Sequence, residues 1–235
     1  MGAARRQPAT TTEQRLTAPA CNPAGTSLAM FTDRADAGRQ LAELLAEHGV
    51  APDVVLAVPR GGLPVGRAVA DALGAPLDIV AARKIGAPSN PELAVGAVAS
   101  DGTRWLNEGL LDRLGVDETY VERETEREHG NAREKIERYR GDRVPPDLAG
   151  RTVLVVDDGI ATGATTTACI RQVRGAGGER VVLGVPVAPP DTVERLLREA
   201  DEVLAVETPP HFGAVGQFYR RFDQVSDEDA AAYLR

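Results

Sequence analysis

Two adjacent carboxylates, Asp157 and Asp158, directly follow four apolar residues at 153–156. A turn rich in glycine and threonine comes next, and a helical pattern continues from residue 165 to 174. Carboxylates accept hydrogen bonds and can hold the neighbouring hydroxyls of a sugar. Glycines at 159 and 163 let backbone N–H groups converge on one point, where a helix start adds partial positive charge. The segment therefore predicts a site for a ribose 5-phosphate.

A strand that ends in two aspartates also occurs in nucleotide-binding proteins that carry a GxxxxGK[ST] loop. The sequence contains no such loop, so this alternative lacks its necessary partner. The residues that we expect to contact the sugar phosphate are Asp157, Asp158, Gly159, Ile160, Ala161, Thr162, Gly163, Ala164, Thr165 and Thr166.

The turn Arg60-Gly61-Gly62 is a second candidate, since it follows an apolar run at 53–58 and precedes a helical pattern at 63–73. Glycines at such a turn let backbone N–H groups approach a diphosphate closely. An Arg-Gly-Gly turn is common in other settings. Here it indicates a diphosphate site because the 153–165 segment occurs in the same chain.

Arg83 and Lys84 are a third candidate, because they follow another apolar run at 77–82. Two cations at the end of a strand often form only a solvated rim. The net charge of −8, however, requires that an anionic ligand be held by a local cluster of cations. Arg60, Arg83 and Lys84 supply such a cluster. Lysine is also rare in this chain, since Lys84 and Lys135 are its only two lysines.

Short apolar runs alternate with helical patterns along the chain, which is typical of a parallel sheet covered on both faces. We therefore expect an α/β fold with a doubly wound, mainly parallel five-stranded sheet. Two segments depart from the alternation. Asp101-Gly102 between extended patterns at 92–99 and 103–106 predicts a projecting hairpin. Residues 117–143 carry dense charge of both signs and a narrow apolar stripe, which predicts a long solvated helix.

Residues 153–165 resemble the signature of the type I phosphoribosyltransferases, which is four apolar residues, two acids and a TG-x-T turn. The resemblance extends over roughly residues 30 to 225 and points to the bacterial branch described as predicted phosphoribosyltransferases. It implies an enzyme that transfers the 5-phosphoribosyl group of phosphoribosyl pyrophosphate to a nitrogenous base or related aromatic acceptor. Pyrophosphate is released in this reaction.

The resemblance also implies roles for particular residues. Arg60, Gly61 and Gly62 match the pyrophosphate loop, and Arg83 with Lys84 match the basic pair below a flexible catalytic loop, here about 85–106 with a lid at 85–91. Lys84, Arg60 and Asp157 are the catalytic candidates. Mg²⁺ would be held mainly by the substrate, with Asp157 and Asp158 acting indirectly. A homodimer is a further implication.

The family binds its acceptor with a variable hood, for which residues 207–235 and the hairpin near Trp105 are the candidates. Aromatic residues at 212, 218 and 219 could stack on a planar base or simply cover the core. An unusual acceptor such as an aromatic acid stays open. The competing function is a non-catalytic regulatory protein that senses phosphoribosyl pyrophosphate.

The length, composition and charge of the chain argue against several other classes of protein. A chain of 235 residues with 43% hydrophobic residues can bury one substantial core. No apolar run reaches the roughly 20 residues of a membrane helix, and no signal-peptide core follows the N-terminus, so we expect a cytoplasmic protein. The acidic balance argues against nucleic acid, and Cys21 and Cys169 are too few for a zinc site. Residues 1–27 are interpreted as a flexible leader before a domain at 28–235.

Overall fold

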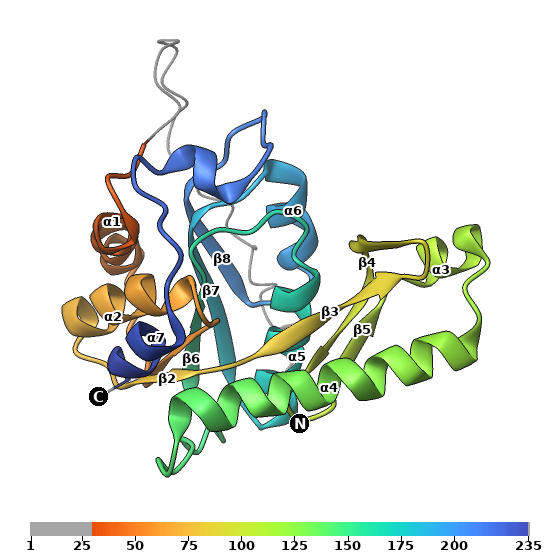
Figure 1. The fold of residues 1–235 in the computed structure, drawn as a ribbon. Coiled ribbons are helices and arrows are strands. Elements are labelled where there is room, and N and C mark those ends of the chain that lie inside the picture. The colour runs from red at the N-terminus through yellow and green to blue at the C-terminus, as the bar shows by residue number, and fades with distance from the viewer. Residues whose placement is uncertain (1–29, 235) are drawn as a thin grey trace, which may run out of the picture.

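The computed structural model describes residues 30–234, so the predicted leader at 1–27 lies outside the described residues. Its centre is a five-stranded parallel sheet in the order β2-β1-β6-β7-β8 (Figure 1). The predicted α/β fold with a parallel five-stranded sheet is confirmed. The strand bounds are β1 Val54–Ala57, β2 Leu77–Ile79, β6 Thr152–Val156, β7 Arg180–Val187 and β8 Glu202–Glu207.

Successive residues of a strand point to opposite faces of the sheet, and helices bury the apolar side chains on both faces. On one side Val55 and Ala57 of β1 meet α1 (Arg34–Glu47) and α2 (Gly62–Leu73). On the other side Val54 and Leu56 join the cluster that contains α5 (Ala164–Gly175) and α6 (Pro190–Leu196). The near-continuous apolar strands of the sequence follow from burial on both faces.

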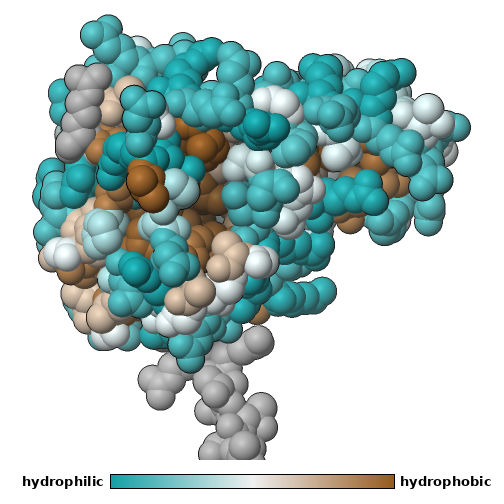
Figure 2. Space-filling model, turned by 90° about the horizontal axis from the view of Figure 1, so that it is seen from below, coloured by the Kyte–Doolittle hydropathy of each residue, from teal (hydrophilic) through white to brown (hydrophobic). Residues whose placement is uncertain are grey.

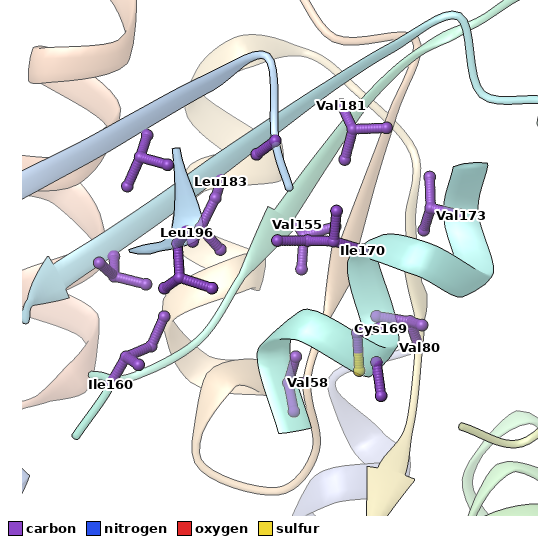
Figure 3. Packing of buried hydrophobic residues seen from close by; sticks show 14 of the residues in the cluster. Val58, Val80, Val155, Ile160, Cys169, Ile170, Val173, Val181, Leu183 and Leu196 are labelled. Atoms are coloured by element: carbon purple, nitrogen blue, oxygen red, sulfur yellow. The ribbon is translucent and has the colours of Figure 1, made fainter. Parts of the chain in front are cut away.

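The hydrophobic cluster that contains α5 and α6 packs α5 against the sheet. Figure 3 shows Val155 of β6, Leu183 of β7 and Ile170 of α5 meeting inside it. Cys169 lies in the same cluster and is fully buried, and burial raises the pKa of its thiol. The helix that follows the glycine-threonine turn is therefore fixed against the sheet by buried hydrophobic residues.

The order of the strands places two loops side by side. The chain moves from β1 outward to β2 on one side, and β6 then pairs with β1 on the other side. The loops that leave the carboxyl ends of β1 and β6 therefore flank the point where the winding reverses. Ligands of open α/β sheets bind at such a switch point.

A second, antiparallel sheet forms an arm that projects from the body (Figure 1). Its strands are β3 (Ala82–Ala87), β4 (Asn90–Ala99) and β5 (Arg104–Leu106), with the predicted turn at Asp101-Gly102. Helix α3 (Glu108–Leu114) follows, and the long helix α4 (Glu118–Arg140) returns along the arm to the body. The predicted hairpin and long helix are both confirmed.

The sequence prediction was wrong on residues 77–91. One strand at 77–82 was expected, followed by a loop at 85–91, but the structure has β2 at Leu77–Ile79 and then β3 at Ala82–Ala87. Only residues 88 and 89 form a turn before β4 begins. Gly86 and Pro88 suggested a loop, whereas antiparallel pairing with β4, bulged near Gly86, satisfies the backbone of this segment.

The C-terminal segment covers the body next to the start of α1. It contains a 3-10 turn at Val215–Phe218 (η1) and α7 at Asp227–Ala232. Phe218 and Tyr219 are buried, and the Tyr219 ring lies 5.3 Å from that of Phe31. The described part of the predicted hood therefore covers the core with two of its aromatic residues.

No helix among residues 30–234 is long and apolar enough to cross a membrane. Seen from below, the surface is largely hydrophilic, with hydrophobic residues gathered in a hollow of the body and in a smaller group under the arm (Figure 2).

Candidate active site

A cavity of about 460 Å³ lies where the loops after β1 and β6 meet. The predicted residues Arg60, Gly61, Arg83, Lys84 and Asp157 all line it, although they come from distant parts of the chain. Its remaining walls are Arg34, Val58, Pro59, Ala82, Lys135, Asp158, Thr165, Phe222, Gln224 and Val225. The structure therefore brings together the three segments that the sequence singled out.

The acid pair lies at the end of β6, on the floor of this cavity. The backbone N–H of Asp158 donates to Oδ1 of Asp157 over 2.8 Å. Burial raises the pKa of Asp157 well above its usual range, and the neighbouring Asp158 raises it further. Burial also raises the pKa of Asp158, against the opposing effect of Arg34. Two carboxylates in this position favour a ligand that offers hydroxyl donors or positive charge.

Sequence reasoning missed Arg34. Its Nε donates to Oδ2 of Asp158 over 2.8 Å, and the two side chains are only 12% and 14% exposed. The guanidinium also lies 3.8 Å from the ring centre of Phe222. Asp33 caps α1 by accepting from the backbone N–H of Asp36, and this fixes the helix start that carries Arg34. No local motif marks Arg34, because its partners lie far along the chain.

The loop Pro59-Arg60-Gly61 after β1 closes one side of the cavity, and its Pro59–Arg60 peptide bond is cis. Gly61 lies so close to the acid pair that a Cβ there would be 2.0 Å from Oδ2 of Asp158. Gly62 lies close to the end of β6, because a Cβ there would be 2.9 Å from the backbone oxygen of Val156. The two glycines are needed because the loop backbone lies directly against β6.

Arg60 is held from outside the cavity by α7. Its NH1 donates to Oδ1 of Asp227 over 3.1 Å, and the Tyr139 hydroxyl donates to the same oxygen. The other oxygen of Asp227 accepts from Arg138 of α4 over 2.8 Å. These donors, Tyr139 first, lower the pKa of Asp227, while burial raises the pKa of Tyr139 to about 12. Arg60 is therefore oriented by Asp227, whose negative charge is also stabilised by Arg138 and the Tyr139 hydroxyl.

The basic pair lies within β3 rather than beyond a strand end. The Nε of Arg83 donates to Oε2 of the buried Glu128 on α4 over 3.0 Å. Lys84 donates from Nζ to Oε2 of Glu92 over 2.7 Å, and the Glu92 side chain is 87% exposed. The Arg83 contact is thus anchored to α4, whereas the Lys84 contact is an exposed pair that contributes little to stability.

The glycine-threonine turn leads into α5 without a side-chain cap. Gly163 occupies the capping position with φ of 76°, a conformation that favours glycine. Within residues 30–234 no side chain accepts from the first backbone N–H groups of α5, which suits an anion. Thr165 is the threonine of this turn that lines the cavity, and Thr166 is only 1% exposed.

Several other predicted residues of the turn make their contacts outside this cavity. Ile160 is buried and its N–H donates to the Val187 backbone oxygen, while the Ala161 oxygen accepts from Thr192 Oγ1. Thr162 and Ala164 line a separate cavity of about 490 Å³ beside the arm. The structure thus groups Asp157, Asp158 and Thr165 in one cavity and turns part of the predicted set away from it.

Lys135 of α4 is a second cavity residue that sequence reasoning did not assign. Its Nζ donates to the backbone oxygen of Pro59 over 2.8 Å. Burial lowers the pKa of this lysine, and the nearby Arg83 lowers it further. The scarcity of lysine was the available signal, because both lysines of the chain line this cavity.

A cavity with an acid pair, an uncapped helix start and several cations can bind a sugar that carries phosphate groups at both ends. Residues 27–223 match the family described as the phosphoribosyl transferase domain. The chain belongs to this family. The resemblance seen in the sequence is therefore confirmed.

Similar proteins support this assignment. A "Putative phosphoribosyl transferase" of Mycobacterium tuberculosis (strain ATCC 25618 / H37Rv) is 45% identical over 207 residues, which is 87% of this chain. The chain spans about half of that relative, 46% of its length. An adenine phosphoribosyltransferase of Rhodococcus opacus (strain B4) is 32% identical over 67% of this chain and 68% of its own length. The crystal structure of TT1426 from Thermus thermophilus is 47% identical, with a TM-score of 0.75 over 87% of this chain and 97% of that one.

Proposed function

We propose that this protein transfers the 5-phosphoribosyl group of phosphoribosyl pyrophosphate to a nitrogenous base or related aromatic acceptor, releasing pyrophosphate, in the presence of Mg²⁺. The observation that carries the proposal is the single cavity lined by the acid pair, by Thr165 at the start of α5 and by cations of the β1 loop, β3 and α4. Family membership supports a transferase of this class.

The two ends of the donor have separate partners in this proposal. Asp157 and the remaining acceptor capacity of Asp158 hold the ribose hydroxyls. The backbone N–H groups at the start of α5, with the Thr165 hydroxyl, hold the 5-phosphate. Arg60 and the backbone of Gly61 hold the diphosphate, whereas the N–H of Gly62 donates to the Val58 oxygen and its missing side chain lets the loop lie against β6. The donor is thus fixed at both ends, and its anomeric carbon lies between them.

The reaction needs no protein nucleophile. The bond between the anomeric carbon and the diphosphate breaks through a transition state that resembles an oxocarbenium ion, as in glycoside chemistry. Negative charge grows on the leaving diphosphate, where Arg60, Arg83 and Lys84 stabilise it. Asp157 stabilises the positive charge that develops on the ribose.

The carboxylates of this cavity fit a Mg²⁺ ion that is held mainly by other ligands. Among residues 30–234 no group of three or more acidic, histidine or cysteine side chains could hold a metal ion. Mg²⁺ commonly binds through one or two carboxylates, water and substrate phosphates, so Asp157 and Asp158 would act indirectly. When bound, the ion would supply further neutralisation of the diphosphate.

The acceptor enters beside Phe222 in this proposal, because that side chain is 37% exposed and lines the cavity next to Gln224 and Val225. Trp105, the other candidate, lines the separate cavity by the arm. A panel of acceptors in the pyrophosphate-release assay identifies the base.

A homodimer also stays a prediction. Light scattering at micromolar concentration would contradict it by giving the mass of a monomer.

The test is pyrophosphate release with Mg²⁺, phosphoribosyl pyrophosphate and a panel of purines, pyrimidines and aromatic acids. We expect release with at least one acceptor and none without Mg²⁺. Calorimetry of donor binding supplies the control, because changing Asp157→Asn together with Asp158→Asn should weaken Mg²⁺-dependent affinity at least about tenfold. Tight donor binding without turnover on any acceptor would instead indicate a regulatory sensor. Absence of donor binding would reject both functions.

A further inference from the structure

Five cationic side chains of residues 30–234 line the cavity, and four of them are paired with carboxylates. Among the described residues, Lys135 is the one cation of this cavity without an acidic side chain within ion-pair distance. The four pairs are Arg34 with Asp158, Arg60 with Asp227, Arg83 with Glu128, and Lys84 with Glu92. The charge of Lys135 is therefore the least compensated of the five.

The surroundings of Lys135 increase the need for an anion. Its Nζ has one hydrogen-bond acceptor among the described residues, the Pro59 oxygen at 2.8 Å, although an ammonium group has three donors. Arg83 and Arg60 are close enough to disfavour its charged form, and burial disfavours it more strongly. Asp157 is the nearby carboxylate that acts in the opposite direction. A partly buried ammonium with free donors and cationic neighbours is the arrangement expected of an anion site.

Helix α4 places Lys135 in line with the other contacts to the donor loops. Glu128, Lys135 and Tyr139 are separated by seven and four positions, so they lie on one face of the helix. Glu128 holds Arg83, Lys135 holds the oxygen of Pro59, and Tyr139 holds Arg60 through Asp227. One helix face thus fixes the diphosphate loop and Arg83 at the same time.

We propose that Lys135 binds the diphosphate of the donor and stabilises it as it leaves. This inference rests on the proposed function and gives a catalytic role to α4, which the sequence alone presents as a solvated surface helix. The electron pair of the bond between the anomeric carbon and oxygen passes to the diphosphate. The acceptor nitrogen supplies the pair for the new carbon–nitrogen bond and loses its proton to water. Lys135 donates hydrogen bonds to the diphosphate throughout and exchanges no atom.

Lys135 and Lys84 consequently have different tasks. Lys84 also lines the cavity, but its ammonium group is paired with Glu92 on the arm and must leave that carboxylate to bind the diphosphate. Lys135 has no acidic partner among the described residues and already contacts the loop that holds the diphosphate. Lys135 should therefore contribute to the affinity for free diphosphate as well as to turnover.

The first experiment is calorimetry with inorganic diphosphate and Mg²⁺ on the full chain. The variant Lys135→Met should bind diphosphate roughly ten- to hundredfold more weakly, as expected for a lost hydrogen bond to a charged group, and Lys135→Arg should recover part of that loss. The matched control is Arg133→Met, which removes a cation from the same helix at a position that is 62% exposed. This control should change the affinity by less than about threefold, since exposed charges are screened.

A second experiment avoids the question of whether Lys135→Met folds. Reductive ¹³C-methylation of the wild-type protein labels two lysines and the terminal amine, because the chain has no other lysine. Addition of diphosphate with Mg²⁺ should shift the Lys135 methyl signal, which is assigned by its absence from Lys135→Arg. Diphosphate should also protect Lys135 from methylation when it is present during the labelling reaction.

The outcomes separate the two proposals. If the wild-type protein binds neither diphosphate nor phosphoribosyl pyrophosphate, the proposed function itself fails. If the wild type binds diphosphate and Lys135→Met binds it equally well, the inference on Lys135 alone is wrong. An unchanged Lys135 methyl signal at saturating diphosphate, or an equal loss in Arg133→Met, would overturn it as well.

Discussion

Arg34 precedes Asp158 by 124 positions in the chain, yet its Nε lies 2.8 Å from Oδ2 of that aspartate. The pair makes the two adjacent carboxylates unequal, since one oxygen of Asp158 is engaged while Asp157 has no arginine partner among the described residues. It also joins the first helix of the described chain to the loop after β6. The cavity therefore depends on a contact that neither local sequence segment indicates.

Replacing Arg34 should destabilise the protein, because it leaves the largely buried Asp158 carboxylate without compensation. We expect Arg34→Gln to lower the free energy of unfolding by roughly 3 kcal/mol at neutral pH. Urea denaturation measures this loss, and the double variant with Asp158→Asn should lose less than the sum of the two single changes. Additive losses in this double-mutant cycle would show that the two side chains do not interact.

The raised pKa of Asp157 predicts a pH-dependent cost to stability. The native state keeps the Asp157 proton at pH values where the unfolded chain, with an ordinary pKa of about 3.9, has lost it. Its contribution therefore decreases as the pH rises from that value to the raised native pKa, and the cost is complete above it. Asp157→Asn should then be more stable than the wild type at neutral pH by on the order of 1 kcal/mol, and this advantage should vanish near pH 4. Urea denaturation of both proteins across that range is the measurement, and a constant difference would contradict the assignment.

A methyl group at Gly61 should disturb the diphosphate loop, because its position would be 2.0 Å from the Asp158 carboxylate. We expect Gly61→Ala to cost about 1–3 kcal/mol in unfolding free energy and to weaken donor binding. Gly130 in α4 is the matched control, since a Cβ there meets nothing within 4 Å. Gly130→Ala should stabilise the helix by about 0.5–1 kcal/mol and leave donor binding unchanged. Equal affinity in both variants would show that the loop does not approach the donor.

Lys84 should act mainly in the transition state, since it must exchange its exposed Glu92 partner for the leaving diphosphate. Lys84→Ala is expected to lower kcat about a hundredfold, which corresponds to about 3 kcal/mol, with a much smaller change in donor affinity. Steady-state kinetics at two ionic strengths test this. An unchanged kcat with a raised, salt-sensitive KM would identify Lys84 as a cation that only attracts the donor.

The parts of the fold that could be predicted are those with a local signal. The parallel sheet followed from apolar runs that alternate with helical patterns, and the 153–165 segment identified the edge where the cavity lies. The hairpin at Asp101-Gly102 had a strong turn signal. Residues 85–91 had a misleading signal, because glycine and proline indicate a loop unless a partner strand is known, and β4 supplies that partner.

The parts of the site that could not be predicted depend on contacts between distant segments. Arg34, Lys135 and Asp227 lie on helices whose local patterns explain them as surface residues, and their roles follow only from what the fold places opposite them. The predicted phosphate turn shows the same limit. Its sequence indicates which residues form the turn, but not that Thr165 faces the cavity while Thr162 lines another.

The bond from Arg34 NH1 to the backbone oxygen of Asp223 spans 189 positions. Arg34 and Val225 thus belong to two walls of one cavity that come from segments far apart in the chain. A chain emerging from the ribosome can form β1, α2 and the arm well before the second wall exists. The site for the donor should thus be complete only after residues 222–227 have left the exit tunnel.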